Sequence, residues 1–306
     1  MNTVQNSPKK VQASAKKVLG ILSNPHRHWV GDGFPVRSLF SYGADSEQVS
    51  PFLLLDHAGP HVFEPALKPR GVGTHPHRGF ETVTIVYEGE VAHRDSVGNG
   101  GVIGPGDVQW MTAAGGILHE EFHSQGYTKS GGPFHMVQLW VNLPAKDKMN
   151  APSYQAIVNS DIPSVDYAGG KARVRVIAGQ FEGHAGPAHT HTPINVWDTS
   201  LQADAKLSFD LPEGHTSLLV VLKGRITVNG TQDAGASEIV SLSREGGTVE
   251  IEAAGDTVLL ILTGEPIDEP VVGYGPFVMN TETQIHQAIA DFNAGRFGAM
   301  EETVNA

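Results

Sequence analysis

The residues with the clearest chemical potential are histidines spaced two apart. His75 and His77 lie in the stretch THPHRGFETVT, residues 74–84. In an extended chain, residues i and i+2 point to the same side, so these two imidazoles can share a divalent metal ion. Pro76 favours an extended backbone at His75, which supports that geometry. The alternative is two surface histidines on a loop before a strand.

A second segment supplies further candidate ligands. His119, Glu121 and His123 alternate in GILHEEFHS, residues 116–124, and in a strand they share one face while Glu120 points away. The two segments together provide three histidines, or two histidines and a carboxylate, from neighbouring strands. Such donors suit Fe(II), Mn(II), Ni(II) or Cu(II) better than calcium, and zinc also accepts them. The alternative for this segment is an exposed polar strand.

The elements that must position these residues are short strands. Runs of β-branched and aromatic residues, bounded by glycine, proline, asparagine or aspartate, recur from residue 17 onward and predict strands. Three segments of the first half match three of the second half in the same order, which predicts two antiparallel β-barrel or jelly-roll domains. The matched segments are 84–91 with 219–226, 107–121 with 238–252, and 134–144 with 256–266.

This repeat predicts the domain organisation of an all-β protein. We expect a flexible tail over residues 1–16, a metal-binding domain over 17–150 and a degenerate second domain over 151–306. Apolar residues at helical spacing predict a short C-terminal helix within residues 281–298, with Thr281 or Thr283 as its cap.

The second half lacks a matching histidine cluster. Asp210 and Pro212 fall where His75 and His77 stand, and two glutamates occupy the places of His119 and Glu121. The half has its own pair, His189 and His191, but that pair lies upstream of the matched strand and is interpreted as part of a loop. One half therefore carries the candidate site, and the other is a scaffold.

Composition excludes several classes of protein. The chain of 306 residues has no cysteine, so disulfides and thiolate metal sites are impossible. A formal net charge of −12 argues against direct binding of nucleic acid. No stretch of 18 apolar residues occurs, so we expect a cytoplasmic protein without a membrane span. We also expect a monomer.

Other histidines in the first half are expected outside the metal site. We expect His26 and His28 on the surface, whereas His57 and His61 flank a turn that can line the mouth of the site. Trp110 is expected in the core.

Here the residues resemble a known family. The stretch HPHRGFETVTIVYEGEVAHRDSVGNGGVIGPGDVQWMTAAGGILHEEFHS, residues 75–124, looks like the pirin family of the cupin superfamily. The similarity extends over about residues 18–295, more loosely in the second half, through THTPINVWD and GYGPFVMNT. It implies a bicupin with one metal site in the first domain. The metal ligands it implies are His75, His77, His119 and Glu121.

The family also uses a different carboxylate from cupins in general. Many cupins take a ligand from a glutamate four residues after the second histidine, which is Glu81 here, and strand periodicity alone does not exclude it. The pirin pattern implies Glu121 instead. The roles of Glu120 and His123, which make this segment more acidic and polar than in many relatives, stay open.

The resemblance implies Fe(II), with Mn, Ni, Cu and Zn as alternatives, and a dioxygenase that cleaves a flavonol such as quercetin with O2. Glu121 is then both a ligand and the general base for the 3-hydroxyl of the substrate. One alternative is an iron-bearing regulator that binds a transcription factor or a metabolic enzyme. Another is a cupin enzyme that acts on a different small molecule.

Overall fold

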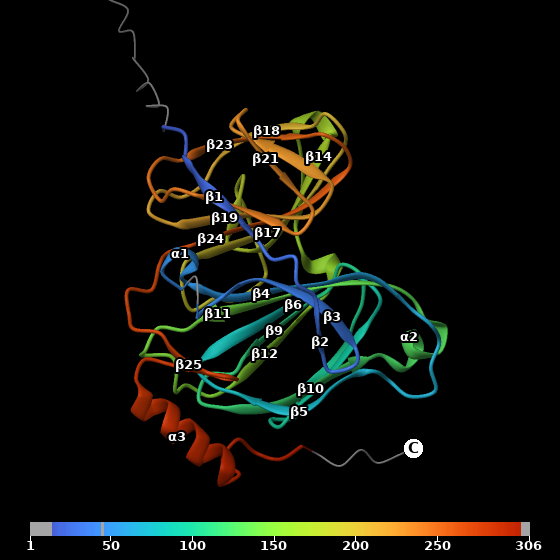
Figure 1. The fold of residues 1–306 in the computed structure, drawn as a ribbon, viewed down its shortest axis with the longest axis vertical. Helices are drawn as coiled ribbons and strands as arrows, with labels where there is room; N and C mark the ends of the chain where they lie inside the picture. Colours follow the sequence, from blue (N-terminus) through green and yellow to red (C-terminus); the bar gives the residue numbers. More distant parts are fainter. Residues whose placement is uncertain (1–13, 44–45, 301–306) are drawn as a thin grey trace, which may run out of the picture.

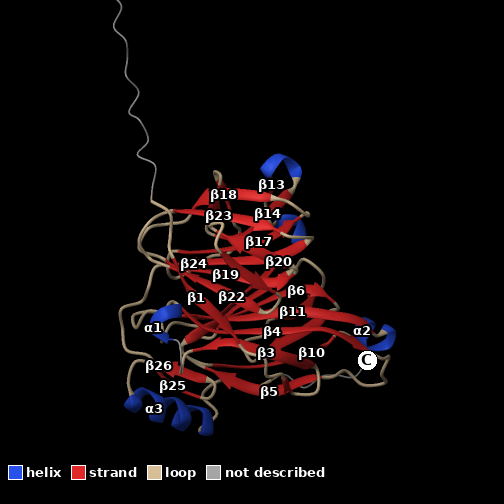
Figure 2. Ribbon diagram, turned by 45° about the horizontal axis from the view of Figure 1, so that its top comes forward, coloured by secondary structure: helices blue, strands red, loops and turns tan. Residues whose placement is uncertain are grey.

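The computed structural model describes residues 14–43 and 46–300. Nearly all regular elements are strands, and they form two domains stacked along the long axis of the molecule (Figure 1). Helices occur only at the periphery of the described chain (Figure 2). Most of the predicted tail, residues 1–13, lies outside the described residues. Lys16 is buried and its Nζ donates to the carbonyl of Ser243 at 3.0 Å.

The first domain contains a seven-stranded and a four-stranded antiparallel sheet. The larger sheet has the order β12 (Ser153–Ile157), β9 (Val108–Thr112), β6 (Phe80–Glu88), β11 (Gly132–Asn142), β4 (Phe52–Phe63), β3 (Phe34–Ser41) and β2 (His28–Val30). The smaller sheet has the order β5 (Gly71–His77), β10 (Ile117–His123), β7 (Val91–Asp95) and β8 (Gly100–Ile103).

The second domain repeats this plan. Its larger sheet has the order β1 (Val18–Ser23), β22 (Glu238–Leu242), β19 (Thr216–Lys223), β24 (Thr257–Gly264), β17 (Ile194–Leu201), β14 (Ala172–Ala178) and β13 (Ser164–Tyr167). Its smaller sheet has the order β18 (Lys206–Asp210), β23 (Thr248–Ala253), β20 (Arg225–Val228) and β21 (Gln232–Gly235). The predicted duplication is therefore present in the strand order.

Two short hairpins and a few helices complete the described chain. The hairpins are β15 (Gln180–Phe181) with β16 (His184–Ala185) and β25 (Val272–Tyr274) with β26 (Phe277–Met279). The helices are α1 (Ser46–Val49), α2 (Gln125–Ser130) and α3 (Glu282–Asn293), with 3₁₀ turns η1 (Asn159–Asp161) and η2 (Ala168–Gly170). In the described residues, the two sheets of each domain do not hydrogen-bond into one closed ring, so each domain is an open jelly roll.

Strands from one half of the sequence enter the domain formed by the other half. β1 pairs with β22 of the second domain, although its sequence lies within the range predicted for the first. β12, which follows residue 150, pairs with β9 of the first domain. The domain boundary near residue 150 stays a prediction. The exchanged edge strands β1 and β12 tie the two domains together.

The two larger sheets pack face to face and share one hydrophobic core. Along β6, the side chains of Val83 and Ile85 enter this shared core, and Val220 and Leu260 meet them from the second domain. Trp110 belongs to the same core and is fully buried, as predicted. Because side chains alternate along a strand, the even-numbered residues of β6 face the interior of the first domain instead.

Polar groups occupy one part of this interface. The Nε2 atoms of His57 and His135 lie 2.7 Å apart, and Nδ1 of His57 lies 3.1 Å from Oγ of Ser237. Burial is the main cause that lowers the pKa of His57 to about 3, and it lowers the pKa of His135 to about 4. His57 therefore lies at the interface between the domains and not at the mouth of the predicted metal site, which the sequence left as one possibility.

The C-terminal segment returns from the second domain to the first. It places α3 beneath the smaller sheet of the first domain (Figure 1). As predicted, Thr281 caps this helix, and its hydroxyl forms a capping box with Gln284. Arg78 donates from Nη1 to Asp291 of α3 at 2.8 Å. No helix within the described residues is long and apolar enough to cross a membrane.

The shared core predicts joint unfolding of the two domains. Leu139→Ala deletes a fully buried side chain at the interface. We expect it to lower the free energy of unfolding by about 2–5 kcal/mol, because the cavity cannot collapse completely. Urea unfolding followed by tryptophan fluorescence and far-UV circular dichroism should show one coincident transition at a lower midpoint. Leu67→Ala, at an exposed position, should leave the midpoint unchanged, and two separate transitions would contradict a shared core.

The buried histidine pair predicts an acid-sensitive interface. The ordinary pKa of 6.5 is lowered in the folded protein to about 3 for His57 and about 4 for His135. Below pH 6.5 the unfolded chain therefore binds protons that the folded chain does not, and stability falls as the pH decreases. In the double variant His57→Asn and His135→Asn, we expect a smaller loss of unfolding free energy between pH 6.5 and pH 4. Equal losses in both proteins, measured by urea titration, would contradict this interpretation.

Candidate metal centre

Two strands of the smaller sheet bring the predicted histidines together. β5 and β10 pair in antiparallel register, with His119 opposite His75 and Ile117 opposite His77. The ring centroids of His75 and His119 lie 4.2 Å apart, and those of His77 and His119 lie 4.8 Å apart. Nitrogen atoms of His75, His77 and His119 all lie within 4.8 Å of one another. These three side chains can therefore converge on one ion.

Glu121 belongs to a second set that shares His119. One carboxylate oxygen of Glu121 lies within 4.8 Å of ring nitrogens of both His93 and His119. The residues predicted as ligands thus lie in one neighbourhood, with three histidines in one set and Glu121 joined to it through His119. Sequence analysis did not find His93. The alternation of Val91, His93 and Asp95 on the buried face of β7 is the signal that could have found it.

The larger sheet holds the carboxylate of Glu121 from the opposite side. Gln109 on β9 donates from Nε2 to Oε1 at 3.2 Å, and Gln138 on β11 donates from Nε2 to Oε2 at 3.1 Å. The Thr84 hydroxyl on β6 lies 3.4 Å from Oε1. These donors come from the face of the sheet that points away from the shared core. They fix the orientation of a carboxylate that is almost fully buried.

His93 is held by neighbours on its own side of the cluster. Its Nε2 lies 3.4 Å from Asp95, and its ring stacks on Tyr154 with 4.9 Å between centroids and 11° between planes. Burial alone would raise the pKa of Asp95, but hydrogen bonds from His93, Asn99 and Val97 lower it overall. Asp95 is therefore an anion that orients the His93 ring beside His119.

Two histidines of the cluster, His77 and His119, are held in the neutral form. Burial, followed by the neighbouring histidines, holds the pKa of His119 well below 6.5. Burial and His75 do the same for His77, although the carbonyl of Pro276 acts in the opposite direction. Neutral imidazole is the form that binds metals, and it needs no proton loss on binding.

Two buried nitrogen atoms support the fit of a metal to this cluster. Among the described residues, Nδ1 of His77 and Nε2 of His119 have no hydrogen-bond partner. Leaving such an atom unpaired in the interior costs about 1–3 kcal/mol, whereas coordination would satisfy it. Imidazole nitrogen with one carboxylate is a donor set for a transition metal. The cluster is therefore suited to one transition-metal ion.

Several neighbouring polar residues lie outside the cluster. Glu81 faces the interface between the domains and accepts a 2.7 Å hydrogen bond from Thr112. Glu120 points outward and pairs with Arg94, at 2.9 Å from Nε. His123 points to a different partner, and its Nε2 lies 3.0 Å from the carbonyl oxygen of Gly33.

Other histidine pairs stay apart from the cluster. His189 and His191 are exposed, as a loop position predicts, and Nδ1 of His191 lies 3.6 Å from Asp147. His26 and His28 are also exposed, as predicted. Neither pair takes part in a group of three candidate ligands within the described chain.

The turn after β5 is anchored by the C-terminal segment. Arg78 follows His77 directly, and its Nε donates to the carbonyl of Gly115 at 2.7 Å. The buried amine of Lys148 donates to the carbonyls of Gly79 and Val278, at 2.7 and 3.0 Å. A segment from the second domain thus fixes the backbone on which His77 stands.

Comparison with known proteins identifies the relatives of the chain. The family model Pirin matches residues 33–141, and the model Pirin C-terminal cupin domain matches residues 196–298. A Pseudomonas aeruginosa protein named as a candidate quercetin 2,3-dioxygenase is 58% identical over 282 residues, which cover 92% of this chain and 98% of that protein. A Pirin-like protein of Caulobacter vibrioides is 41% identical and covers 87% of this chain and 94% of its own length.

Solved structures agree with these relationships. The crystal structure of quercetin 2,3-dioxygenase from Acinetobacter baumannii has a TM-score of 0.92 and 53% sequence identity. The likeness covers 94% of this chain and 99% of that one. The predicted all-β fold with two cupin domains and a short C-terminal helix is confirmed. So is the predicted likeness to quercetin 2,3-dioxygenases.

The geometry predicts which glutamate affects metal binding. Glu121→Gln removes a charged donor beside His119, and we expect it to reduce metal content after dialysis about tenfold or more. Glu81→Gln is the matched control, because Glu81 lies on the other face of the sheet and should retain full metal content. Elemental analysis of the purified variants measures both. Equal metal loss in the two variants would contradict the assignment of Glu121.

Proposed function

The chain belongs to the pirin family, and on that basis we propose that it is a metal-dependent dioxygenase that opens the heterocycle of a flavonol such as quercetin. The single observation that supports this best is the cluster of histidines beside a buried carboxylate held by two glutamines. The names of the relatives supply the substrate class. We retain the predictions of a monomer in the cytoplasm as expectations.

We propose His75, His77, His119 and Glu121 as the metal ligands and Fe(II) as the metal. The short distances between the three histidines support this choice of ligands, and so do the unpaired nitrogens of His77 and His119. His93 is a positioning residue in this proposal, because its ring lies between Asp95 and His119. When bound, the metal would supply Lewis acidity and one-electron chemistry toward O2.

Glu121 is proposed to take the proton of the flavonol 3-hydroxyl. Gln109 and Gln138 orient its two oxygens, so the carboxylate is pre-organised and needs little rearrangement to accept a proton. The glutamine amides cannot compete for that proton, because they act only as donors toward Glu121. Their role is to hold the base in place.

The surroundings of His77 suit a flat aromatic substrate. The rings of Phe80 and Trp140 stack with centroids 4.2 Å apart, and Trp140 also lies edge-on to His77. Tyr42 stacks on Trp140, which is half-buried. His75 is the most exposed histidine of the cluster, so we propose that substrate and O2 approach from its side.

The proposal is tested by iron-dependent loss of quercetin. Protein loaded with iron without oxygen should, once oxygen is admitted, consume quercetin and O2 in equal amounts. We expect Glu121→Gln to lower kcat by about 10²–10⁴-fold, the usual contribution of a general base. Flavonol absorbance and an oxygen electrode follow the reaction.

A matched pair of variants controls this test. His75→Ala should reduce turnover to background, whereas His189→Ala, in the exposed loop pair, should leave it unchanged. Equal flavonol loss in wild type and His75→Ala would contradict the proposal. Partner capture that depends on the redox state of the metal would then favour the regulator hypothesis.

A further inference from the structure

A second site lies between the two domains. A cavity of about 650 Å³ opens there, and its walls come from β3, β4, β6 and β11 of the first domain and from β19 and β24 of the second. This volume falls within the range of about 300–1,000 Å³ typical of small-molecule pockets. His57 and Tyr87 line it from the interface side of the larger sheet. The cavity is therefore separate from the metal centre, which lies on the other face of that sheet.

Cationic side chains converge on this cavity without carboxylate partners. Arg27, Arg37 and Lys223 line it, and Glu88 is the acidic residue among its walls. Within residues 14–43 and 46–300, none of the three cations forms an ion pair. The buried Nε of Arg37 also has no hydrogen-bond partner. A buried guanidinium donor without an acceptor is costly, and an anionic ligand would relieve that cost.

The histidines beside these cations respond to the positive field. After burial and His135, the charges of Arg37 and Arg27 contribute to the lowered pKa of His57. Lys223 contributes in the same direction at His135, after burial. Both rings thus stay neutral, and the positive charge of the cavity resides on the arginines and the lysine.

A chain of hydrogen bonds at the cavity wall can present a donor to an anion. Ser237, His57 and His135 are linked through contacts of 3.1 and 2.7 Å. If His135 donates to Nε2 of His57, then Nδ1 of His57 carries the proton and donates to Oγ of Ser237. The hydroxyl hydrogen of Ser237 is then free to point at a ligand. An anion selects this arrangement of protons over the reverse one.

The remaining walls are apolar or aromatic. Pro60, Leu222 and Val258 line the cavity together with Tyr87, whose ring stacks on His135 with 4.9 Å between centroids. Such walls favour an organic body over a fully hydrated inorganic ion. A ligand that satisfies both parts of the cavity has a negative head group and a flat apolar body.

We propose that the cavity between the domains binds an aromatic carboxylate, with its carboxylate at Arg37, Arg27 and Lys223 and its ring against Tyr87 and the apolar wall. The planar guanidinium of Arg37 is suited to a bidentate bond with a carboxylate. The site is additional to the metal centre and does not depend on the proposed reaction there.

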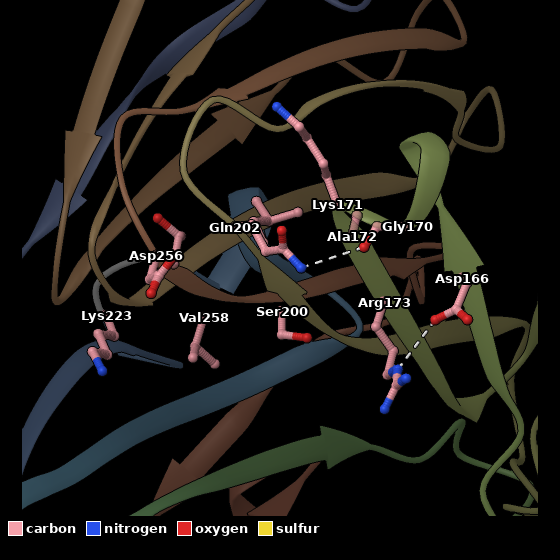
Figure 3. A pocket seen from close by; sticks show the side chains of 12 residues that line it. Asp166, Gly170, Lys171, Ala172, Arg173, Ser200, Gln202, Lys223, Asp256 and Val258 are labelled. Atoms are coloured by element: carbon pink, nitrogen blue, oxygen red, sulfur yellow. Dashed lines mark hydrogen bonds and ion pairs between the residues drawn. The ribbon is translucent and has the colours of Figure 1, made fainter.

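The adjoining surface hollow lacks this chemistry. It shares Lys223 and Val258 with the cavity, as Figure 3 shows at one side of the hollow. Its own arginine, Arg173, already pairs with Asp166 at 3.2 Å, and both side chains are exposed (Figure 3). Arg173 therefore offers a matched control: an arginine beside the cavity whose charge is already compensated.

The test uses full-length, metal-loaded protein and two isosteric probes. Isothermal titration calorimetry compares 2-naphthoate with the neutral 2-naphthamide. We expect wild-type protein to bind the carboxylate at least about tenfold more tightly, because only the anion forms ion pairs with the cationic side chains. Arg37→Met should weaken naphthoate binding by about tenfold or more and leave naphthamide binding unchanged, whereas Arg173→Met should change neither.

Two further variants separate folding and location from binding. Arg27→Gln with Lys223→Gln alters only exposed positions at the rim, so it tests the charge requirement even if Arg37→Met fails to fold. His119→Ala disrupts the metal centre and should leave naphthoate affinity unchanged. The proposal is overturned if naphthoate does not bind, if both probes bind equally, if the rim variant binds like wild type, or if His119→Ala abolishes binding.

Discussion

The structure depends on burying both faces of the larger sheet of the first domain. One face supplies Val83, Ile85 and Leu139 to the core shared with the second domain. The other face points at the smaller sheet and carries Thr84 and Gln138. Since most side chains on both faces are buried, a buried polar side chain on the sheet needs a protein partner or a ligand. The metal centre and the cavity between the domains are the two places where such groups gather.

This constraint explains why the carboxylate of Glu121 is so firmly held. Gln109 and Gln138 come from separate strands of the larger sheet, and each donates to a different oxygen of Glu121. A buried carboxylate without these donors would be costly, and the amides without the carboxylate would be unpaired in turn. The site is therefore built by two sheets that oppose each other, and the shared core holds one of those sheets in place.

Local pattern was sufficient to find the strands and the candidate ligand pairs, because i, i+2 alternation is a property of the strand itself. The same alternation could not decide whether Glu81 is a ligand. Alternation holds within one strand, and the turn at Gly79 separates His77 from Glu81. His93 was missed because its partners, Gln109 and Tyr154, come from distant strands. The exchange of β1 and β12 between domains likewise depends on long-range pairing that no short window of sequence contains.

The strand β6 couples the two sites through its register. Thr84 faces the metal centre, and Tyr87, an odd number of residues further along, faces the cavity between the domains. A slip of one residue would turn Thr84 toward the shared core and Tyr87 toward the interior of the first domain, so that both sites would fail together. The neighbours β9 and β11 oppose such a slip with Trp110 and Leu139 in the core. The second domain, whose described residues hold no such candidate cluster, therefore still contributes to the metal centre, because its packing fixes the register of the strands that support Glu121.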